Sequence, residues 1–204
     1  MRKLMVMNSV TLDGVMQAPG RPDEDERGGF THGGWAMPYN DAVRGQLMGE
    51  GMSRPTELVF GRRTYEDFYK VWPKRTNNPF TPFLDNARKY VASRTLADPL
   101  PWQNSTLLSG DAGSAIAHLK RQPGPDLLVM GSGVLIASLR EHNLVDEYLL
   151  LIHPLVLGKG SRLFTEGAAF ANLHLVSSVQ TTTGVIAATY RPATTGAASE
   201  PAPS

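Results

Sequence analysis

Residues 127–153 contain the feature that most restricts how this chain can fold. A short, wholly apolar run at 127–130 breaks into a Gly-Ser-Gly turn at 131–133. Apolar residues then recur at helical spacing over 134–142, and a second apolar run follows at 148–152. Short, fully apolar runs are typical of strands buried on both faces of a parallel sheet. The stretch therefore predicts a strand, a glycine turn, a helix and a second strand.

The Gly-Ser-Gly turn is a candidate phosphate site because it stands where the predicted helix begins. Backbone N–H groups at a helix N-terminus have no intrahelical partner, and the helix dipole is positive there. Glycine lets a phosphate approach because it has no Cβ. The turn lacks the third glycine of the dinucleotide-binding fingerprint. A ligand-binding loop and a tight structural turn are therefore both open interpretations.

The rest of the chain repeats the pattern of short apolar strands separated by helical segments, which is typical of a parallel α/β sheet. Further strands are predicted at 3–10, 57–60, 89–92 and 106–109, and helices at 40–53, from Thr64 onward, at 82–87, and after Asp111, a predicted N-cap. Residues 173–181 and 185–191 alternate around Thr183-Gly184, which predicts an antiparallel hairpin at the sheet edge. We expect a single domain over 1–192 and a disordered tail over 193–204, which is rich in Ala, Thr, Ser and Pro.

Composition excludes several classes of protein. The chain has 204 residues with 20 basic and 19 acidic side chains, so its balanced charge argues against a nucleic-acid-binding face. There is no cysteine, which excludes disulfides and cysteine metal sites and fits a reducing compartment. The apolar run near the N-terminus is too short for a signal peptide or a membrane span. We expect a cytoplasmic protein without metal, membrane or nucleic-acid partners.

Two arginines follow the strand at 57–60. Gly61, Arg62 and Arg63 precede Thr64, and the spacing of Thr64 and Asp67 predicts a capping box that starts a helix. An arbitrary arginine pair is more often solvated surface. Guanidinium groups at a strand end and helix start nevertheless form a strong phosphate site, and this context favours that function. Ser93 and Arg94 follow the next strand in the same way.

Three other segments carry candidate substrate-facing residues. Asp13 follows the first strand, either as a turn former or as a polar group facing a ligand beyond the strand end. The long loop at 17–39 contains His32 and Trp35, and it either covers a pocket or packs Trp35 on the core. The loop at 158–162 is bracketed by glycines and carries two cations. Its candidate residues are Gly158, Lys159 and Arg162.

Five of these motifs, taken together and in order, resemble the dihydrofolate-reductase-like fold. They are LDG at 12–14, FGRRTYE at 60–66, VASRT at 91–95, VMGSGVLIASL at 129–139 and HPLVLGKGSRLF at 153–164. The resemblance covers about residues 2–191 and is closest to the reductase domain of bacterial riboflavin biosynthesis (the RibD C-terminal domain) and its stand-alone relatives. It implies a three-layer α/β fold, with a mostly parallel central sheet, helices on both faces and a C-terminal antiparallel hairpin at the edge.

The resemblance also implies NADPH as cofactor and a reductase activity. The implied cofactor-binding residues are Gly61, Arg62, Arg63, Thr64, Ser93, Arg94, Gly131, Ser132, Gly133 and Val134. Arginines near a 2′-phosphate favour NADPH over NADH. The expected reaction is hydride transfer to a C=N or C=O bond of a small heterocyclic or sugar-derived substrate, with 5-amino-6-(5-phosphoribosylamino)uracil as a candidate. We expect Asp13 to orient the substrate or supply a proton, with His32, Trp35 and the 158–162 loop around it.

The sequence departs from this family in one respect that bears on the substrate. Dihydrofolate reductases hold the pteridine with an acidic residue in the first helix, and Asp41 is only a loose stand-in for it. Folate reduction is therefore disfavoured. The alternatives to a reductase of the riboflavin type are a divergent dihydrofolate reductase and a nucleotide-binding protein without turnover. Because related proteins are often dimers, we expect a homodimer.

Overall fold

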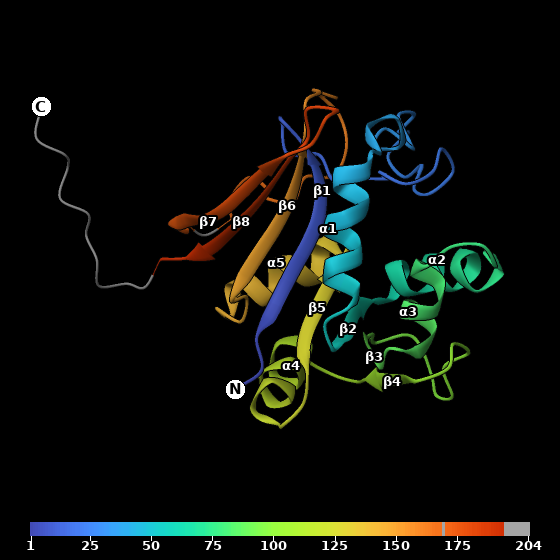
Figure 1. The fold of residues 1–204 in the computed structure, drawn as a ribbon. Helices are drawn as coiled ribbons and strands as arrows, with labels where there is room; N and C mark the ends of the chain where they lie inside the picture. Colours follow the sequence, from blue (N-terminus) through green and yellow to red (C-terminus); the bar gives the residue numbers. More distant parts are fainter. Residues whose placement is uncertain (169, 194–204) are drawn as a thin grey trace, which may run out of the picture.

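The computed structural model describes residues 1–168 and 170–193, so the expected tail lies almost wholly outside the described residues. One eight-stranded sheet runs through the molecule in the order β4-β3-β2-β5-β1-β6-β8-β7 (Figure 1). Its strands are β1 Leu4–Thr11, β2 Thr56–Gly61, β3 Lys89–Ala92, β4 Ser105–Leu108, β5 Asp126–Met130, β6 Glu147–His153, β7 Leu173–Gln180 and β8 Ile186–Pro192.

The strands from β4 to β6 are parallel, and β8 and β7 are antiparallel additions at one edge. The predicted fold class is confirmed, including the C-terminal hairpin. Each parallel pair needs a crossover connection, and helices provide most of these connections. The helices are α1 Ala42–Met52, α2 Arg62–Val71, α3 Phe80–Asn86, α4 Ala112–Arg121 and α5 Gly133–Glu141, with short 3₁₀ turns η1 Met37–Tyr39 and η2 Trp72–Lys74.

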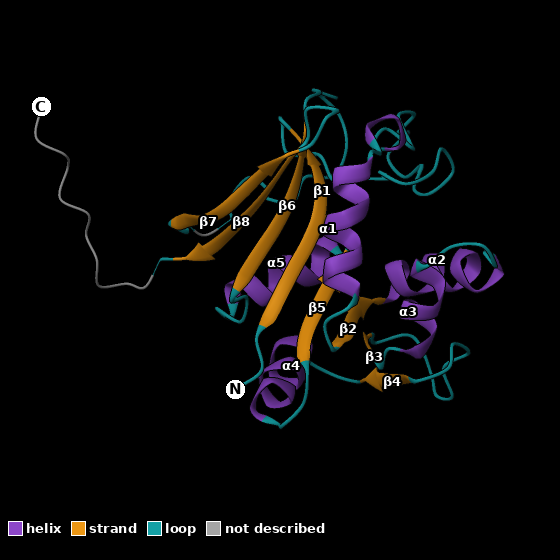
Figure 2. Ribbon diagram, viewed as in Figure 1, coloured by secondary structure: helices purple, strands orange, loops and turns teal. Residues whose placement is uncertain are grey.

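Helices cover both faces of the sheet (Figures 1 and 2). Side chains of successive strand residues point to opposite faces, and β6 follows this rule. Tyr148 and Leu150 pack in the core with α4 and α5. Leu151 lies in a separate cluster with Leu47 and Met48 of α1 on the other face. None of the helices of the described residues is both long and apolar enough to cross a membrane.

Lys89, the first residue of β3, is fully buried. Its Nζ donates hydrogen bonds to the carbonyl oxygens of Asp85 at 3.1 Å, Ala87 at 2.8 Å and Gln103 at 3.0 Å. It also lies 4.7 Å from the centroid of the Trp102 ring. Burial lowers the pKa of Lys89 to about 8. The amine thus joins α3 to the segment before β4, and these contacts satisfy its three donors.

Candidate active site

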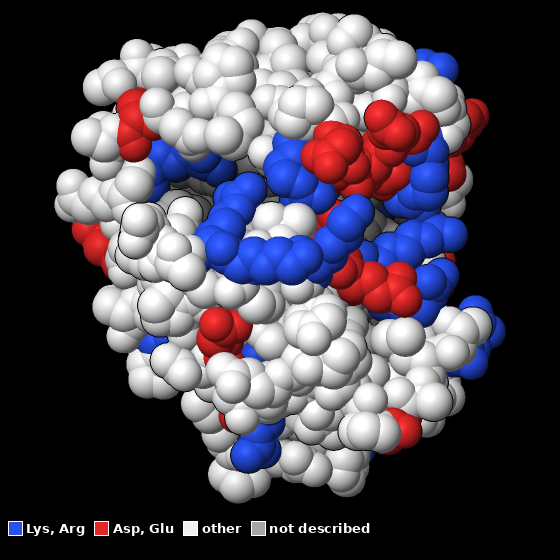
Figure 3. Space-filling model, turned by 90° about the vertical axis from the view of Figure 1, so that its right-hand side faces the viewer, with Lys and Arg blue, Asp and Glu red and all other residues white. Residues whose placement is uncertain are grey.

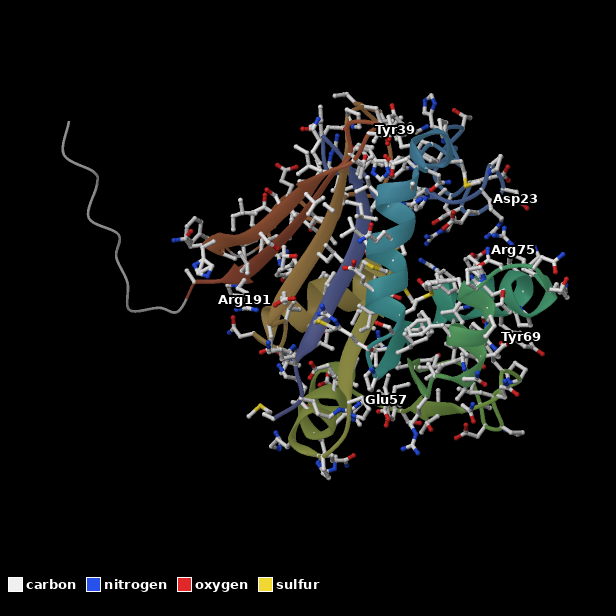
Figure 4. All side chains as sticks on the ribbon, in the orientation of Figure 1. Asp23, Tyr39, Glu57, Tyr69, Arg75 and Arg191 are labelled. Atoms are coloured by element: carbon white, nitrogen blue, oxygen red, sulfur yellow. The ribbon has the colours of Figure 1, made fainter. Side chains whose placement is uncertain are left out.

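The carboxyl ends of adjacent parallel strands bring the predicted turns to one edge of the sheet. Because β3, β2, β5 and β1 are neighbours, the residues after each strand lie along this edge. Tyr39 lies beside the same edge, whereas Glu57 lies at the opposite end of β2 (Figure 4). The Gly61–Thr64 and Gly131–Val134 turns are therefore brought together.

Direct hydrogen bonds join these two turns. The Gly61 N–H donates to Ser132 Oγ at 3.0 Å, and the Ser132 N–H donates to Thr64 Oγ1 at 3.0 Å. Asn8 of β1 supports the turn from the other side, since its Oδ1 accepts from the Gly131 N–H at 3.0 Å. The two helix starts are thus held in a fixed relation.

The predicted capping box of Thr64 and Asp67 is wrong. Helix α2 begins at Arg62 with Gly61 as its N-cap, and no side chain caps it. Thr64 instead accepts from Ser132, and Asp67 forms an ion pair with Arg21 at 2.6 Å. Both side chains have partners far away in the sequence, so the local capping pattern does not form.

The glycine turn has an unusual backbone and close neighbours. Gly131 has a φ of +59°, and Ser132 also has a φ of +59°, the left-handed region that non-glycine residues seldom occupy. A Cβ on Gly131 would lie 3.0 Å from Thr64 Cγ2, and one on Gly133 would lie 3.1 Å from Met16 Sδ. Left-handed backbone conformations of non-glycine residues, such as that of Ser132, cluster at functional sites.

Helices α2 and α5 both begin without a side-chain cap. Their first-turn N–H groups therefore have no side-chain acceptor, and the dipoles of both helices point positive ends to this place. Arg62 is paired with Glu66 at 2.9 Å, whereas Arg63 is exposed and has no ion pair among the described residues. This set of donors fits the phosphates of a dinucleotide cofactor.

Ser93 and Arg94 lie at the same edge after β3. Ser93 Oγ accepts from the N–H groups of Thr95 at 3.1 Å and Leu96 at 3.0 Å, so it forms its own turn. Arg94 is exposed. Both residues are thus placed beyond β3, next to the arginine turn of β2.

Asp13 fastens a second loop to the end of β1. Its carboxylate accepts from Thr11 Oγ1 at 2.6 Å, from the Gly158 N–H at 2.8 Å and from the Leu157 N–H at 3.2 Å. The Thr11 hydroxyl has the largest effect and lowers the pKa of Asp13; burial opposes it, and the Gly158 and Leu157 amides lower the pKa further, to about 2. The group is therefore ionised at neutral pH and holds no proton to donate.

Cations of the 158–162 loop complete this corner of the molecule. Arg162 Nε donates to the Asp13 carbonyl oxygen at 2.8 Å, and Lys159 Nζ donates to the Gly29 carbonyl oxygen at 3.1 Å. A cavity of about 280 Å³ is lined by Gln17, Arg27, Gly28, Phe30, Lys159, Gly160 and Ser161. The loop is thus fixed to the 28–30 segment and borders open space.

The structure separates the two aromatic candidates of the long loop. Trp35 is buried, donates from Nε1 to the Gln17 carbonyl oxygen at 2.7 Å, and meets His153 edge to face at 5.0 Å. It packs in a buried cluster and does not line the 280 Å³ cavity, so the structure does not support its assignment to the substrate. His32 is exposed at the surface. Of the two interpretations of Trp35, the packed one matches the structure.

Two contributors to this site were missed in the sequence. Asn8 holds the glycine turn, and Arg21 connects the long loop to α2 through both oxygens of Asp67, at 2.6 and 3.3 Å. No local pattern marks either residue. On the face that carries the long loop and α2, Lys and Arg side chains gather along a hollow (Figure 3).

The chain matches a known protein family over most of its length. The model of the RibD C-terminal domain matches residues 2–187. The uncharacterized protein YyaP of Bacillus subtilis (strain 168) is 29% identical over 198 residues, which cover 93% of this chain and 94% of that protein.

Solved structures share the fold. A putative riboflavin biosynthesis protein from Shewanella sp. PV-4 is 23% identical with a TM-score of 0.68, over 94% of this chain and 99% of that one. A dihydrofolate reductase from Enterococcus faecalis complexed with NADP(H) is 15% identical with a TM-score of 0.56, over 93% of this chain and 96% of that one. A deaminase/5-amino-6-(5-phosphoribosylamino)uracil reductase from Thermotoga maritima is 16% identical with a TM-score of 0.60. The match covers 94% of this chain but 57% of the Thermotoga chain. The chain described here belongs to the RibD C-terminal domain family.

Proposed function

We propose that this protein is an NADPH-dependent reductase that transfers a hydride to a C=N or C=O bond of a small heterocyclic or sugar-derived substrate. The observation that carries the proposal is the pair of uncapped helices, α2 and α5, whose first residues are joined through Ser132 and Thr64. Two positive helix ends fixed side by side form a site for a group with several phosphate oxygens.

The residues of the three turns divide the cofactor between them. The N–H groups of the Gly131–Val134 turn would bind the pyrophosphate, because Ser132 provides no cap to compete for them. Arg62 and Arg63 would bind the adenosine 2′-phosphate, with Ser93 and Arg94 beside it. NADH has no charge at that position, so the arginines favour NADPH.

The bound nicotinamide would supply the hydride. Asp13 orients the substrate and the 158–162 loop, since an ionised carboxylate cannot act as the proton donor. His32, Gly158, Lys159 and Arg162 border the substrate, and Trp35 supports the loop from the core. The fixed loops hold the substrate in place and exclude water from the reacting carbons.

The structural relatives include two proteins with riboflavin-pathway names and one dihydrofolate reductase, and the family model is that of the RibD C-terminal domain, so we favour the riboflavin pathway over folate. The Thermotoga relative is named as a 5-amino-6-(5-phosphoribosylamino)uracil reductase. That compound is our candidate substrate. Asp41 is not available to hold a pteridine, because it caps α1 and binds the hairpin turn.

We further propose a cytoplasmic homodimer. Support comes from β7, an edge strand whose side chains are mostly exposed, with Leu175, Val176 and Val179 among its large apolar residues. Light scattering after size-exclusion chromatography tests the dimer, and a monomer at working concentration would contradict it.

The cofactor is tested by titrating the protein with NADPH and with NADH while following tryptophan fluorescence. Arg63→Ala should weaken the binding of NADPH by about tenfold or more, as expected for hydrogen bonds to a charged group. It should leave the binding of NADH unchanged. Arg54→Ala is the matched control, because Arg54 is exposed at the other end of β2. Equal affinity of the wild type for the two nucleotides would refute the role of the arginines. NADPH oxidation in a substrate screen then separates a reductase from a binding protein.

A further inference from the structure

Arg44, in the first turn of α1, is a half-buried arginine whose side chain has no hydrogen bond or ion pair among the residues that the structure describes. Its Nε is buried and makes no hydrogen bond. Its two amino groups also lack hydrogen bonds and ion pairs among the described residues, and solvent reaches them. Burial lowers the pKa of Arg44, against the charge of Asp41. Because a buried donor without an acceptor is unfavourable, the placement of Nε requires an explanation other than stability.

Asp41 lies close in sequence but does not pair with Arg44. One carboxylate oxygen accepts from the Thr182 N–H and the Thr182 hydroxyl, both at 2.6 Å, and from the Thr183 N–H at 3.2 Å. The other accepts from the backbone N–H of Arg44 at 2.8 Å. The cap and the hairpin turn therefore occupy this carboxylate, and the guanidinium group senses its charge without forming an ion pair with it.

His153, at the end of β6, presents a second unsatisfied group nearby. The residue is fully buried, and its Nδ1 lies 2.9 Å from the Leu151 carbonyl oxygen. A carbonyl can only accept, so Nδ1 carries the proton and Nε2 holds a lone pair. Nε2 is buried without a partner. Burial, and next the nearby charge of Arg44, lower the pKa of His153 against the Leu151 and Val10 carbonyls, which favour its protonated form.

Both residues lie at the edge of the sheet that carries the candidate active site. His153 is the register partner of Thr11 on β1, and the Thr11 hydroxyl donates to Asp13. The rings of Trp35 and Tyr39 meet His153 edge to face at 5.0 and 5.4 Å and hold it in place. Helix α1 lies over this end of the sheet (Figure 1). The charge of Arg44 acts on His153, so Arg44 lies near the end of β1 that leads to Asp13.

We propose that Arg44 is a specificity-determining residue that binds an anionic oxygen group of the substrate. This inference rests on the proposed function for the identity of the bound molecule as substrate. A guanidinium group binds carboxylate and phosphate oxygens through the same planar donors. The site therefore selects for negative charge, the opposite of what an acidic residue at the first helix selects.

The test uses the Arg62→Ala/Arg63→Ala variant, in which the nucleotide phosphate site is removed, so that binding at Arg44 is measured separately. Inorganic phosphate and malonate are titrated while tryptophan fluorescence is followed. Adding Arg44→Met should weaken binding of the preferred anion by about tenfold to a hundredfold, as expected for lost hydrogen bonds to a charged group. Arg44→Lys should retain part of the affinity. Arg54→Met should have no effect.

Stability provides the readout that separates binding from structure. Because Arg44 makes no side-chain hydrogen bond or ion pair, Arg44→Met should unfold in urea at the same or a higher concentration than its parent. Three outcomes would each overturn the proposal. Arg44→Met could bind the anions as its parent does, or the parent could bind neither anion. The third outcome is a loss of binding that accompanies a loss of stability. Since no nucleotide is needed, failure of the NADPH titration would refute the reductase assignment and leave the anion site standing.

Discussion

Two pairs of helices in this protein begin in opposite ways. Helices α1 and α4 are capped by Asp41 and Asp111, whose carboxylates accept from the N–H groups of Arg44 at 2.8 Å and Ser114 at 2.7 Å. Helices α2 and α5 begin at Gly61 and Ser132, and neither has a side-chain cap. Every helix start has unsatisfied donors. The chain supplies its own acceptors at one pair and none at the other, which is where we expect a ligand to supply them.

The largest expected effect comes from adding a side chain to the Gly-Ser-Gly turn at 131–133. Gly131→Ala should lower the free energy of unfolding by about 2 kcal/mol, because alanine is strained at a positive φ and its Cβ would lie 3.0 Å from Thr64 Cγ2. The substitution should also weaken the binding of NADPH. Urea denaturation and the nucleotide titration measure the two effects.

Gly45→Ala is the matched control for that substitution. Gly45 lies within α1 with nothing near its missing Cβ. Alanine there should raise stability by about 0.5–1 kcal/mol and leave nucleotide binding unchanged. If both substitutions had the same effect on binding, the distinction between the open and capped helices would not hold.

Removal of a cap should affect stability alone. Asp111→Ala should cost about 1 kcal/mol, the usual loss for an N-cap carboxylate, measured by urea denaturation. NADPH affinity should match that of the wild type. A weaker affinity would mean that the capped helices also contribute to the site.

Adding a capping side chain to α2, which has none, should raise the stability of the protein and weaken its binding of NADPH. Gly61 has a φ of −79°, and a Cβ there meets only ordinary contacts at 3.6 Å. Gly61→Asp should raise stability by a few tenths of a kcal/mol. Its negative charge should weaken the binding of NADPH. Gly61→Asn tests the cap without the charge and should bind NADPH better than Gly61→Asp does. Equal affinities would show that charge at this position is irrelevant.

The smallest expected effect is a change in the stability of the protein at acidic pH. Hydrogen bonds from the Thr182 hydroxyl, and next from the Arg44 amide, lower the pKa of Asp41 to about 2 from an ordinary 3.8. A carboxylate with a lowered pKa in the folded state contributes stability above 3.8, and this is lost as pH falls toward about 2. Between those values the urea midpoint should fall more for the wild type than for Asp41→Asn. Parallel curves would contradict this contribution.

The fold and the three turns could be predicted because their signals are local. Apolar runs, glycines and arginines lie next to one another in the chain, and the Asp111 cap needs only residues of its own helix. The partners that fix the site are remote. Thr64 meets Ser132 across 68 residues, and Arg21 meets Asp67 across 46. Since many side chains could accept from Ser132, no local pattern identifies Thr64 in place of the expected cap.

The chemistry of individual charged groups also depends on partners that are remote in the sequence. The ionised state of Asp13 depends on the Gly158 amide, 145 residues away. The unpaired state of Arg44 depends on the hairpin turn that occupies Asp41. A sequence names the charged groups, but only the assembled sheet determines which charges are compensated.

Buried Lys89 has a consequence for chemical labelling of the protein. In the folded state, burial lowers the pKa of this amine to about 8, so a fraction of it is unprotonated near neutral pH. Because the folded chain encloses it fully, an acylating reagent can reach it only when β3 and α3 separate. The rate of modification at this one amine would therefore report how often that part of the sheet opens, while the exposed lysines react regardless.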